Sequence, residues 1–152
     1  MEGTSTAGGL TVGSEITGPT RVMTAERVEW YGSAMLSAAA GDAIKVGSNI
    51  HTDAAYAKSE GLPAIIADGM ISTNWLSSML VAHFGLGYIE RGELRTKFIK
   101  PIFLGQTIST RGRVKAVEPA GTGATRLTLD VWCEDENGVK VTDGDAKVEL
   151  PR

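Results

Sequence analysis

The sequence predicts an α+β domain in which one long buried helix packs against an antiparallel sheet. Over residues 64–85, apolar side chains recur on most sides of a helix, which is typical of a helix enclosed by other structure. After residue 87, four segments have the residue pattern of β-strands, and turn-forming residues separate them. The length of 152 residues suits one domain. We expect that domain over residues 10–152, after a flexible arm of small and polar residues over 1–9.

The first half of the chain predicts an extended lead-in and two helices. Residues 10–23 mix Val and Ile with Gly and Pro, which favours a short strand or an extended segment. Thr24 is the expected N-cap of a helix that runs to about residue 40 and stops at a glycine. A loop without a sustained period follows. A short Ala-rich helix is then expected over 52–59, with Thr52 or Asp53 as its N-cap.

The second half predicts four strands, at residues 94–103, 106–118, 125–136 and 139–150. In the third, Leu127, Leu129 and Val131 alternate with more polar residues, which is typical of a strand with one buried face. The sequence Glu136-Asn137-Gly138 favours a tight hairpin turn before the last strand. A buried helix followed by such a meander requires a sheet that curves around the helix.

Composition excludes several classes of function. The net charge of −3 comes from 15 basic and 18 acidic side chains spread along the chain, without the basic stripe of a nucleic-acid-binding protein. Two histidines and one cysteine are scattered, so we expect no metal site, and no nucleotide or flavin motif indicates a cofactor. Cys133 is the only cysteine, which rules out an intrachain disulfide. With neither a signal peptide nor a membrane-spanning stretch in the sequence, we expect a soluble cytoplasmic protein.

The most informative segment is NIHTDAAYAKSEGLPAIIADGM, residues 49–70. It resembles the signature of the MaoC-like dehydratases, which include the (R)-specific enoyl-CoA hydratases. The matching pieces are Ile50-His51-Thr52-Asp53, Tyr56-Ala57, Gly61, Ile66-Ala67-Asp68-Gly69-Met70 and the later segment Phe98-Ile99-Lys100-Pro101-Ile102-Phe103-Leu104-Gly105. The pieces occur in the family's order and spacing, and the resemblance extends over roughly residues 24–150.

The resemblance implies a hot-dog fold, in which a curved antiparallel sheet wraps a long central helix. It also implies a hydro-lyase that interconverts a 2-enoyl and a 3-hydroxyacyl thioester, linked to CoA or to a carrier. That reaction needs a base to activate water, and histidine, which titrates near neutral pH, is suited to this role. It also needs donors for the negative charge on the thioester oxygen, which a helix N-terminus supplies. By resemblance, His51 is the base and the N–H of Gly69 is the oxyanion donor.

The chain departs from the family pattern at the catalytic acid. The family aspartate lies five residues before the histidine, where this chain has Val46. Asp42 could still reach His51 from a longer loop, or Asp68 could supply the carboxyl group, or His51 could act with water and Asn49 alone. Each aspartate also has an ordinary interpretation, as a turn residue or a helix-end residue.

The resemblance also implies substrate-binding positions, for which we take Asn49, Met70 and Ser77. Simpler interpretations remain open: Gly69 could serve tight packing alone, and Ser77 could be a small residue beneath the sheet. His83 has no motif around it, and we expect a structural role for it.

Two other functions remain open on the same fold. One is an acyl thioesterase, for which Asp68 near the start of the central helix would supply a carboxylate. The other is a non-catalytic module that binds an acyl chain or a partner subunit. In every case we expect a homodimer or a larger homo-oligomer, because an unpaired edge of an apolar sheet favours association.

Overall fold

The structure, a computed structural model, describes residues 9–40, 48–121 and 123–151. Its elements are, in chain order, β1 (Glu15–Thr17), β2 (Arg21–Val22), α1 (Ala25–Ala40), α2 (Ala54–Ser59), α3 (Gly69–Phe84), α4 (Leu86–Ile89), β3 (Glu93–Phe98), β4 (Thr107–Ala120), β5 (Ala124–Glu134) and β6 (Lys140–Pro151). Apart from Gly9, the arm predicted over 1–9 lies outside the described residues and stays a prediction.

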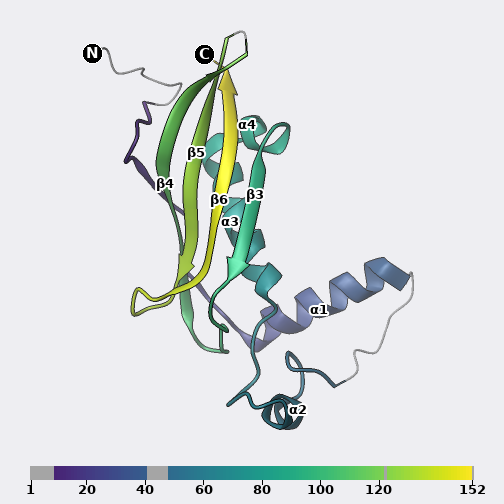
Figure 1. The fold of residues 1–152 in the computed structure, drawn as a ribbon. Helices are drawn as coiled ribbons and strands as arrows, with labels where there is room; N and C mark the ends of the chain where they lie inside the picture. Colours follow the sequence, from purple (N-terminus) through teal and green to yellow (C-terminus); the bar gives the residue numbers. More distant parts are fainter. Residues whose placement is uncertain (1–8, 41–47, 122, 152) are drawn as a thin grey trace.

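One antiparallel sheet forms the body of the molecule. Its strand order is β1-β4-β5-β6-β3, with β2 also paired to β4, so strands from the N-terminus join the meander of the second half. The sheet curves around α3, which lies along its concave side, whereas α1 projects away from the sheet near one end of α3 (Figure 1). This is the hot-dog arrangement that the sequence predicted, with the long helix in the middle.

The core lies between α3 and the inner face of the sheet. Strand β5 buries every second side chain, including Leu127, Leu129 and Val131, as its period-2 pattern predicted. These side chains pack with Leu76 and Leu80 of α3 in one apolar cluster. Burial of such side chains is the main free-energy term that holds the helix against the sheet.

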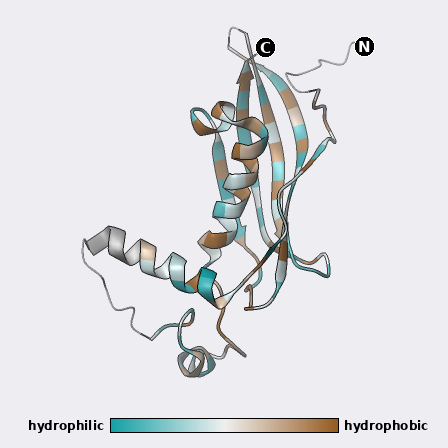
Figure 2. Ribbon diagram, turned by 180° about the vertical axis from the view of Figure 1, so that it is seen from behind, coloured by the Kyte–Doolittle hydropathy of each residue, from teal (hydrophilic) through white to brown (hydrophobic). Residues whose placement is uncertain are grey.

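The sequence predicted that α3 is buried on most sides, and the structure corrects this in part. The side that faces the sheet is buried, but Met70, Asn74 and Val81 lie on an exposed stripe. Figure 2 shows α3 in front of the sheet with apolar residues on the visible side as well. In the single chain, therefore, the sheet covers only part of the apolar surface of α3.

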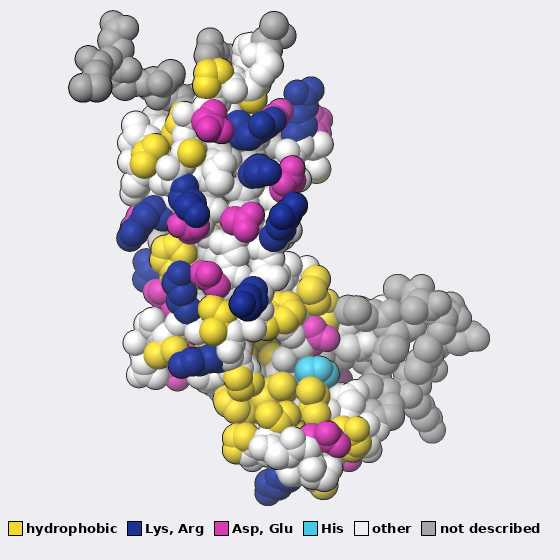
Figure 3. Space-filling model, in the orientation of Figure 1, with side chains coloured by type: hydrophobic (Ala, Val, Ile, Leu, Met, Phe, Trp, Pro, Cys, Tyr) yellow, Lys and Arg dark blue, Asp and Glu magenta, His cyan; other side chains and the backbone are white. Residues whose placement is uncertain are grey.

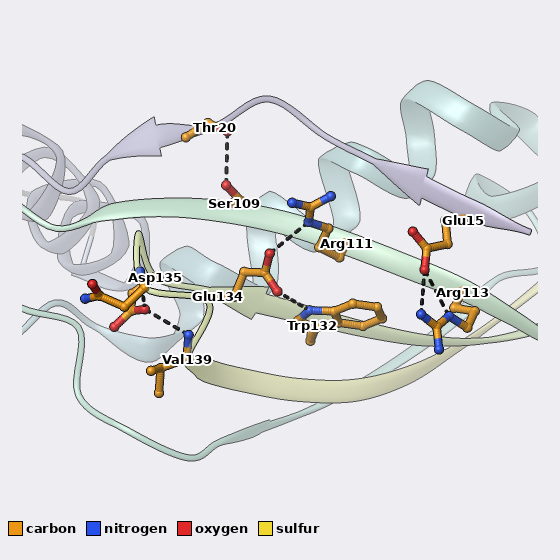
Figure 4. A network of polar contacts seen from close by, with 10 residues as sticks. Glu15, Thr20, Ser109, Arg111, Arg113, Trp132, Glu134, Asp135 and Val139 are labelled. Atoms are coloured by element: carbon orange, nitrogen blue, oxygen red, sulfur yellow. Dashed lines mark hydrogen bonds and ion pairs between the residues drawn. The ribbon is translucent and has the colours of Figure 1, made fainter.

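The outer face of the sheet carries a mixture of opposite charges (Figure 3). Several of them form ion pairs between neighbouring strands, among them Lys115 with Asp130 at 2.8 Å and Arg111 with Glu134 at 2.9 Å. Glu134 also accepts a hydrogen bond from the Trp132 indole at 2.8 Å (Figure 4). Such exposed pairs contribute little to stability, and they give the sheet a charge-balanced surface.

Most predicted elements are present, and the differences have local causes. Strand β3 ends at Phe98, although the sequence predicted a strand to residue 103. The N–H groups of Ile99 and Lys100 both donate to the carbonyl oxygen of Val141, which ends the regular ladder, and Pro101 has no N–H to continue it. The short helix α4 was not predicted, because its four residues cannot display a helical period. Among the described residues, no helix has the length and apolarity needed to cross a membrane.

Candidate active site

His51 and Gly69 line the same cavity, which has a volume of about 400 Å³. The cavity lies beside the N-terminus of α3 and next to the segment that follows β3. Its wall is mostly apolar and includes Leu62, Ile66, Ala67, Phe98, Ile99, Pro101 and Ile102, with Lys100 and Thr142 as further polar side chains. A small, largely apolar cavity with few polar groups is the usual form of a small-molecule site.

Hydrogen bonds from residues before and after His51 in the sequence fix the loop that carries it. The Asn49 side-chain oxygen Oδ1 accepts the backbone N–H of His51 at 2.8 Å. Asp53 then caps α2 by accepting the N–H groups of Ala55 and Tyr56, so one of the two predicted caps is confirmed. These hydrogen bonds and one from Ser48 hold the pKa of Asp53 below its usual value.

The imidazole of His51 has a defined tautomer. Its Nδ1 lies 2.8 Å from the carbonyl oxygen of Ile66. A carbonyl oxygen only accepts hydrogen bonds, so Nδ1 carries the proton and donates it. In the neutral ring, Nε2 then keeps its lone pair, and among the described residues we find no hydrogen-bond partner for Nε2. The ring can therefore take up a proton at Nε2 without breaking the contact that orients it.

The peptide that receives this hydrogen bond is itself held on two sides. The N–H of Ile66 donates to the carbonyl oxygen of Ile50, and the N–H of Ala67 donates to that of Ile102. Ile66 also forms an isolated antiparallel bridge with Phe103. The histidine loop, the entry to α3 and the segment after β3 are thus joined by backbone contacts, which positions the ring against the helix.

The N-terminus of α3 leaves one backbone donor without a partner. The N–H of Met70 donates to Oδ1 of Asp68 at 2.8 Å, and the N–H of Ile71 donates to the Asp68 carbonyl oxygen at 3.1 Å. Within the described part of the chain, the N–H of Gly69 has no acceptor. Since the helix dipole concentrates partial positive charge at this end, the free donor is suited to a developing negative charge.

Gly69 also serves the packing that the sequence left open as its simpler role. A Cβ atom at this position would lie 2.7 Å from carbon atoms of the Phe98 ring, which is closer than carbon atoms pack. The absent side chain therefore allows Phe98 to lie against the start of α3. Packing and a free N–H are compatible, because they use different atoms of Gly69.

The other predicted site residues lie at different distances from this cavity. Asp68 is the N-cap of α3, and the Met70 side chain is exposed beside it. Neither of these two residues, nor Asn49, belongs to the lining of the cavity. Ser77 lies about 12 Å further along α3 than Gly69, at 1.5 Å per residue, and its hydroxyl accepts a hydrogen bond from Tyr88 at 3.1 Å.

The structure describes only one of the two predicted carboxylate partners of the imidazole. Asp42 lies outside the described residues. Asp68 uses Oδ1 to cap the helix, and among the described residues no carboxylate hydrogen-bonds to the His51 ring. His83 is exposed on α3, where its Nε2 lies 2.9 Å from the Thr17 carbonyl oxygen. No cluster of three metal-binding side chains occurs in the described ranges.

Two of the cavity residues that had no assigned role make contacts between distant parts of the chain. Phe98 ends β3 and begins the later family motif, and its contact with Gly69 joins residues far apart in the chain. Thr142, on β6, reaches the cavity from another strand and hydrogen-bonds to Ser72 of α3 at 2.7 Å. No local pattern around Thr142 could have indicated this position.

Comparisons with solved structures identify similar folds across almost the whole chain. An R-hydratase from Pseudomonas aeruginosa has a TM-score of 0.69 at 23% identity, covering 95% of this chain and 84% of the other. An (R)-hydratase from A. caviae, involved in PHA biosynthesis, has a TM-score of 0.68 at 21% identity, covering 95% and 100%. A truncated (3R)-hydroxyacyl-ACP dehydratase complex from Mycobacterium tuberculosis has a TM-score of 0.65 at 16% identity, covering 91% and 96%.

Sequence comparison gives the family. A search of curated protein sequences finds no match. The sequence model of the MaoC-like domain matches residues 48–133, a range that holds both His51 and Gly69. This match spans more than half of the chain and agrees with the hot-dog fold of the structure. The chain belongs to the MaoC-like domain family.

Proposed function

We propose that the protein is a hydro-lyase that interconverts a 2-enoyl and a 3-hydroxyacyl thioester, carried by CoA or by a carrier protein. The observation that carries the proposal is the meeting of two groups at one cavity. These are an imidazole with a free Nε2 and a helix N-terminus with a free N–H at Gly69. The hydratases and the dehydratase of similar fold support this class of reaction.

In the proposed hydration, Nε2 of His51 takes a proton from water while the water oxygen forms a bond to the β-carbon of the enoyl group. The electron pair of the carbon–carbon double bond moves toward the thioester carbonyl, whose oxygen gains negative charge. The N–H of Gly69 donates to that oxygen. The proton that His51 has taken up then passes to the α-carbon, directly or by way of a carboxyl group, which completes the addition of water and restores the neutral ring. Dehydration uses the same groups in reverse.

The first experiment measures hydration of crotonyl-CoA, or of a longer or branched enoyl-CoA, by loss of the enoyl thioester absorbance. We expect His51→Ala to lower kcat/KM by about a hundredfold or more, because it removes the general base. His83→Ala is the matched control, since it removes the other histidine from an exposed face of α3. Normal turnover by a folded His51→Ala protein would overturn the proposal.

The same assay tests whether Asp42 or Asp68 supplies a carboxyl group that helps to move the proton to the α-carbon. Asp42→Asn and Asp68→Asn each remove one ionisable group with little change of shape. A loss confined to Asp42→Asn would assign the role to the loop before His51, and a loss confined to Asp68→Asn would assign it to the helix cap. Retained activity in both variants would favour His51 acting with water and Asn49.

Two measurements separate the alternatives. Release of free thiol while the enoyl absorbance persists would indicate a thioesterase. Binding of thioesters without turnover over a broad panel would indicate a non-catalytic acyl-binding module. Both outcomes contradict a hydro-lyase and leave the fold and family unchanged.

We also propose that the protein acts as a homodimer. Strand β3 pairs with β6 on one side and forms an edge of the sheet on the other. The cavity wall from Phe98 to Ile102 begins at the last residue of this edge strand. A second copy added at this edge would lie next to the cavity, which would link assembly to activity.

A further inference from the structure

A second cavity, of about 600 Å³, lies between α1 and α3 and shares no lining residue with the His51 cavity. Three aromatic side chains form much of its wall, namely Trp30 and Tyr31 of α1 and Trp75 of α3. Arg27, Ile71 and Asn74 also line it. The proposed hydro-lyase reaction uses none of these residues.

Two guanidinium groups lie near one indole ring of the cavity wall, although only that of Arg27 belongs to the cavity lining. Arg21 of β2 lies 5.5 Å from the centre of the Trp75 ring, and Arg27 of α1 lies 5.7 Å from it. Both distances allow a cation–π contact with Trp75. Three elements that are separate in the sequence thus place two positive charges together.

These charges lack a carboxylate partner within the described residues. Arg21 donates only to the carbonyl oxygen of Pro19, at 3.4 Å, and Arg27 forms no ion pair there. Burial lowers the pKa of Arg21, and the positive charge of Arg27 lowers it further. Glu26 also lines the cavity, but within the described residues it forms no ion pair with either guanidinium group. An anion beside the two guanidinium groups would relieve their repulsion.

The aromatic side chains of the cavity wall indicate that the ligand also carries a flat apolar group. Trp30 is 72% exposed, the largest exposed fraction among the large apolar side chains of the described residues. A flat ring that packs on Trp30 would remove apolar surface of both partners from water. The positive charge lies next to Trp75, whereas the exposed Trp30 ring lies one helical turn after Glu26 on α1.

We propose that the groove between α1 and α3 binds an anionic ligand with a flat aromatic ring, whose ring packs on Trp30 and whose carboxylate or phosphate pairs with Arg21 and Arg27. The site does not use His51; the CoA source rests on the proposed function, whereas the aromatic carboxylate source goes beyond it. Two kinds of ligand combine an anionic group with a flat aromatic ring, namely an aromatic carboxylate and the nucleotide end of CoA. The experiment distinguishes between them.

The experiment measures binding by titration calorimetry on the full chain. The probes are 2-naphthoate for the first source and adenosine 3′,5′-bisphosphate for the second, with 2-naphthamide and adenosine as neutral counterparts. We expect one anionic probe to bind saturably, to bind at least about tenfold more tightly than its neutral counterpart, and to weaken as salt is raised. Equal binding of the anionic and neutral probes, or no saturable binding of either anion, would overturn the proposal.

Variants then place the bound anion. We expect Arg21→Gln/Arg27→Gln to weaken binding by at least about tenfold, whereas Arg113→Gln/Arg126→Gln, which removes the same charge from the outer face of the sheet, should leave it unchanged. Trp30→Ala tests the ring contact at an exposed position where the fold is not at risk.

Unchanged binding in both the arginine and the tryptophan variants would place the ligand elsewhere and overturn the proposal. A change of oligomeric state without a change of binding would show that the groove is a subunit contact, which also overturns it.

Discussion

His51 differs from His83 in which nitrogen is engaged and in what surrounds it. The Nδ1 of His51 donates to the Ile66 carbonyl oxygen, which leaves Nε2 for proton transfer inside a cavity. His83 has its Nε2 against the Thr17 carbonyl oxygen on an exposed face. The two histidines thus differ in which ring nitrogen is engaged, and His51 is the one that lines the cavity of the proposed active site.

At Gly69, a methyl group is expected to destabilise the protein. Gly69→Ala places Cβ against the Phe98 ring, so we expect the free energy of unfolding to fall by about 1–3 kcal/mol in thermal or urea denaturation. Gly32→Ala on α1 is the control, because nothing lies near its Cβ and alanine favours a helix. In a double-mutant cycle, Phe98→Ala should remove most of the penalty. A penalty that persists in the double variant would contradict the steric explanation.

The Cys133 thiol is expected to be unreactive in the folded protein. Burial raises the pKa of this thiol to about 12, and the charge of Arg21 offsets the effect only in part. Since the thiolate is the reactive form, an alkylating reagent at neutral pH should modify Cys133 far more slowly in native protein than in urea. Mass spectrometry of timed samples measures both rates. Comparable rates would show that the thiol is accessible.

The same shift has a consequence for stability at alkaline pH. The folded state favours the protonated thiol, so its contribution is complete below the usual thiol pKa of 9.0 and is lost progressively as the pH rises toward 12. Cys133→Ala should therefore show a weaker loss of stability than the unchanged protein over this range.

At the scale of elements, the entry to α3 combines a helix cap with the candidate oxyanion donor. Asp68 satisfies the N–H of Met70 by its side chain and that of Ile71 by its carbonyl group. Of these first three donors of α3, only the N–H of Gly69 has no acceptor among the described residues. The cap therefore fixes where the helix begins and occupies the two donors that follow Gly69.

Asp68→Ala is expected to lower the free energy of unfolding by about 1 kcal/mol, because it removes a helix cap. Asp68→Asn should change stability much less, since asparagine caps a helix about as well as aspartate does. Chemical denaturation of the two variants measures the difference. An equal loss of stability in both would show that the charge of Asp68, rather than its cap hydrogen bond, stabilises the helix.

At the scale of the whole molecule, apolar surface and an unpaired sheet edge occur close to the candidate site. Phe98 at the end of the edge strand β3 and Ile99 directly after it are about half exposed, and Met70 at the start of α3 is exposed to a similar degree. Exposed apolar residues next to a sheet edge are typical of a surface that associates with another chain.

We expect light scattering on purified protein to give a mass of at least twice the 16.0 kDa of one chain. The mass should fall on dilution only at low concentrations if the contact is large and apolar. Hydrogen exchange should then show protection along β3, whose outer edge has no strand partner in the single chain. A stable monomer at assay concentrations with full activity would contradict the homodimer proposal.

The sequence by itself determined the family motif, the order of the longer helices and strands and the cap at Thr24, and it limited the cap of the short helix to Thr52 or Asp53. Periodicity and capping depend on residues within about four positions of one another, so they can be read along the chain. The motif also indicated His51 and Gly69 as the two candidate catalytic residues.

Only the tertiary structure decided what those residues can do. The tautomer of His51 depends on a carbonyl group fifteen residues away, and the packing of Gly69 depends on Phe98. The paired guanidinium groups of Arg21 and Arg27 need β2, α1 and α3 to meet at Trp75. Contacts between distant segments exist only once the sheet has curved around the helix, because no local pattern specifies which segments will pack together.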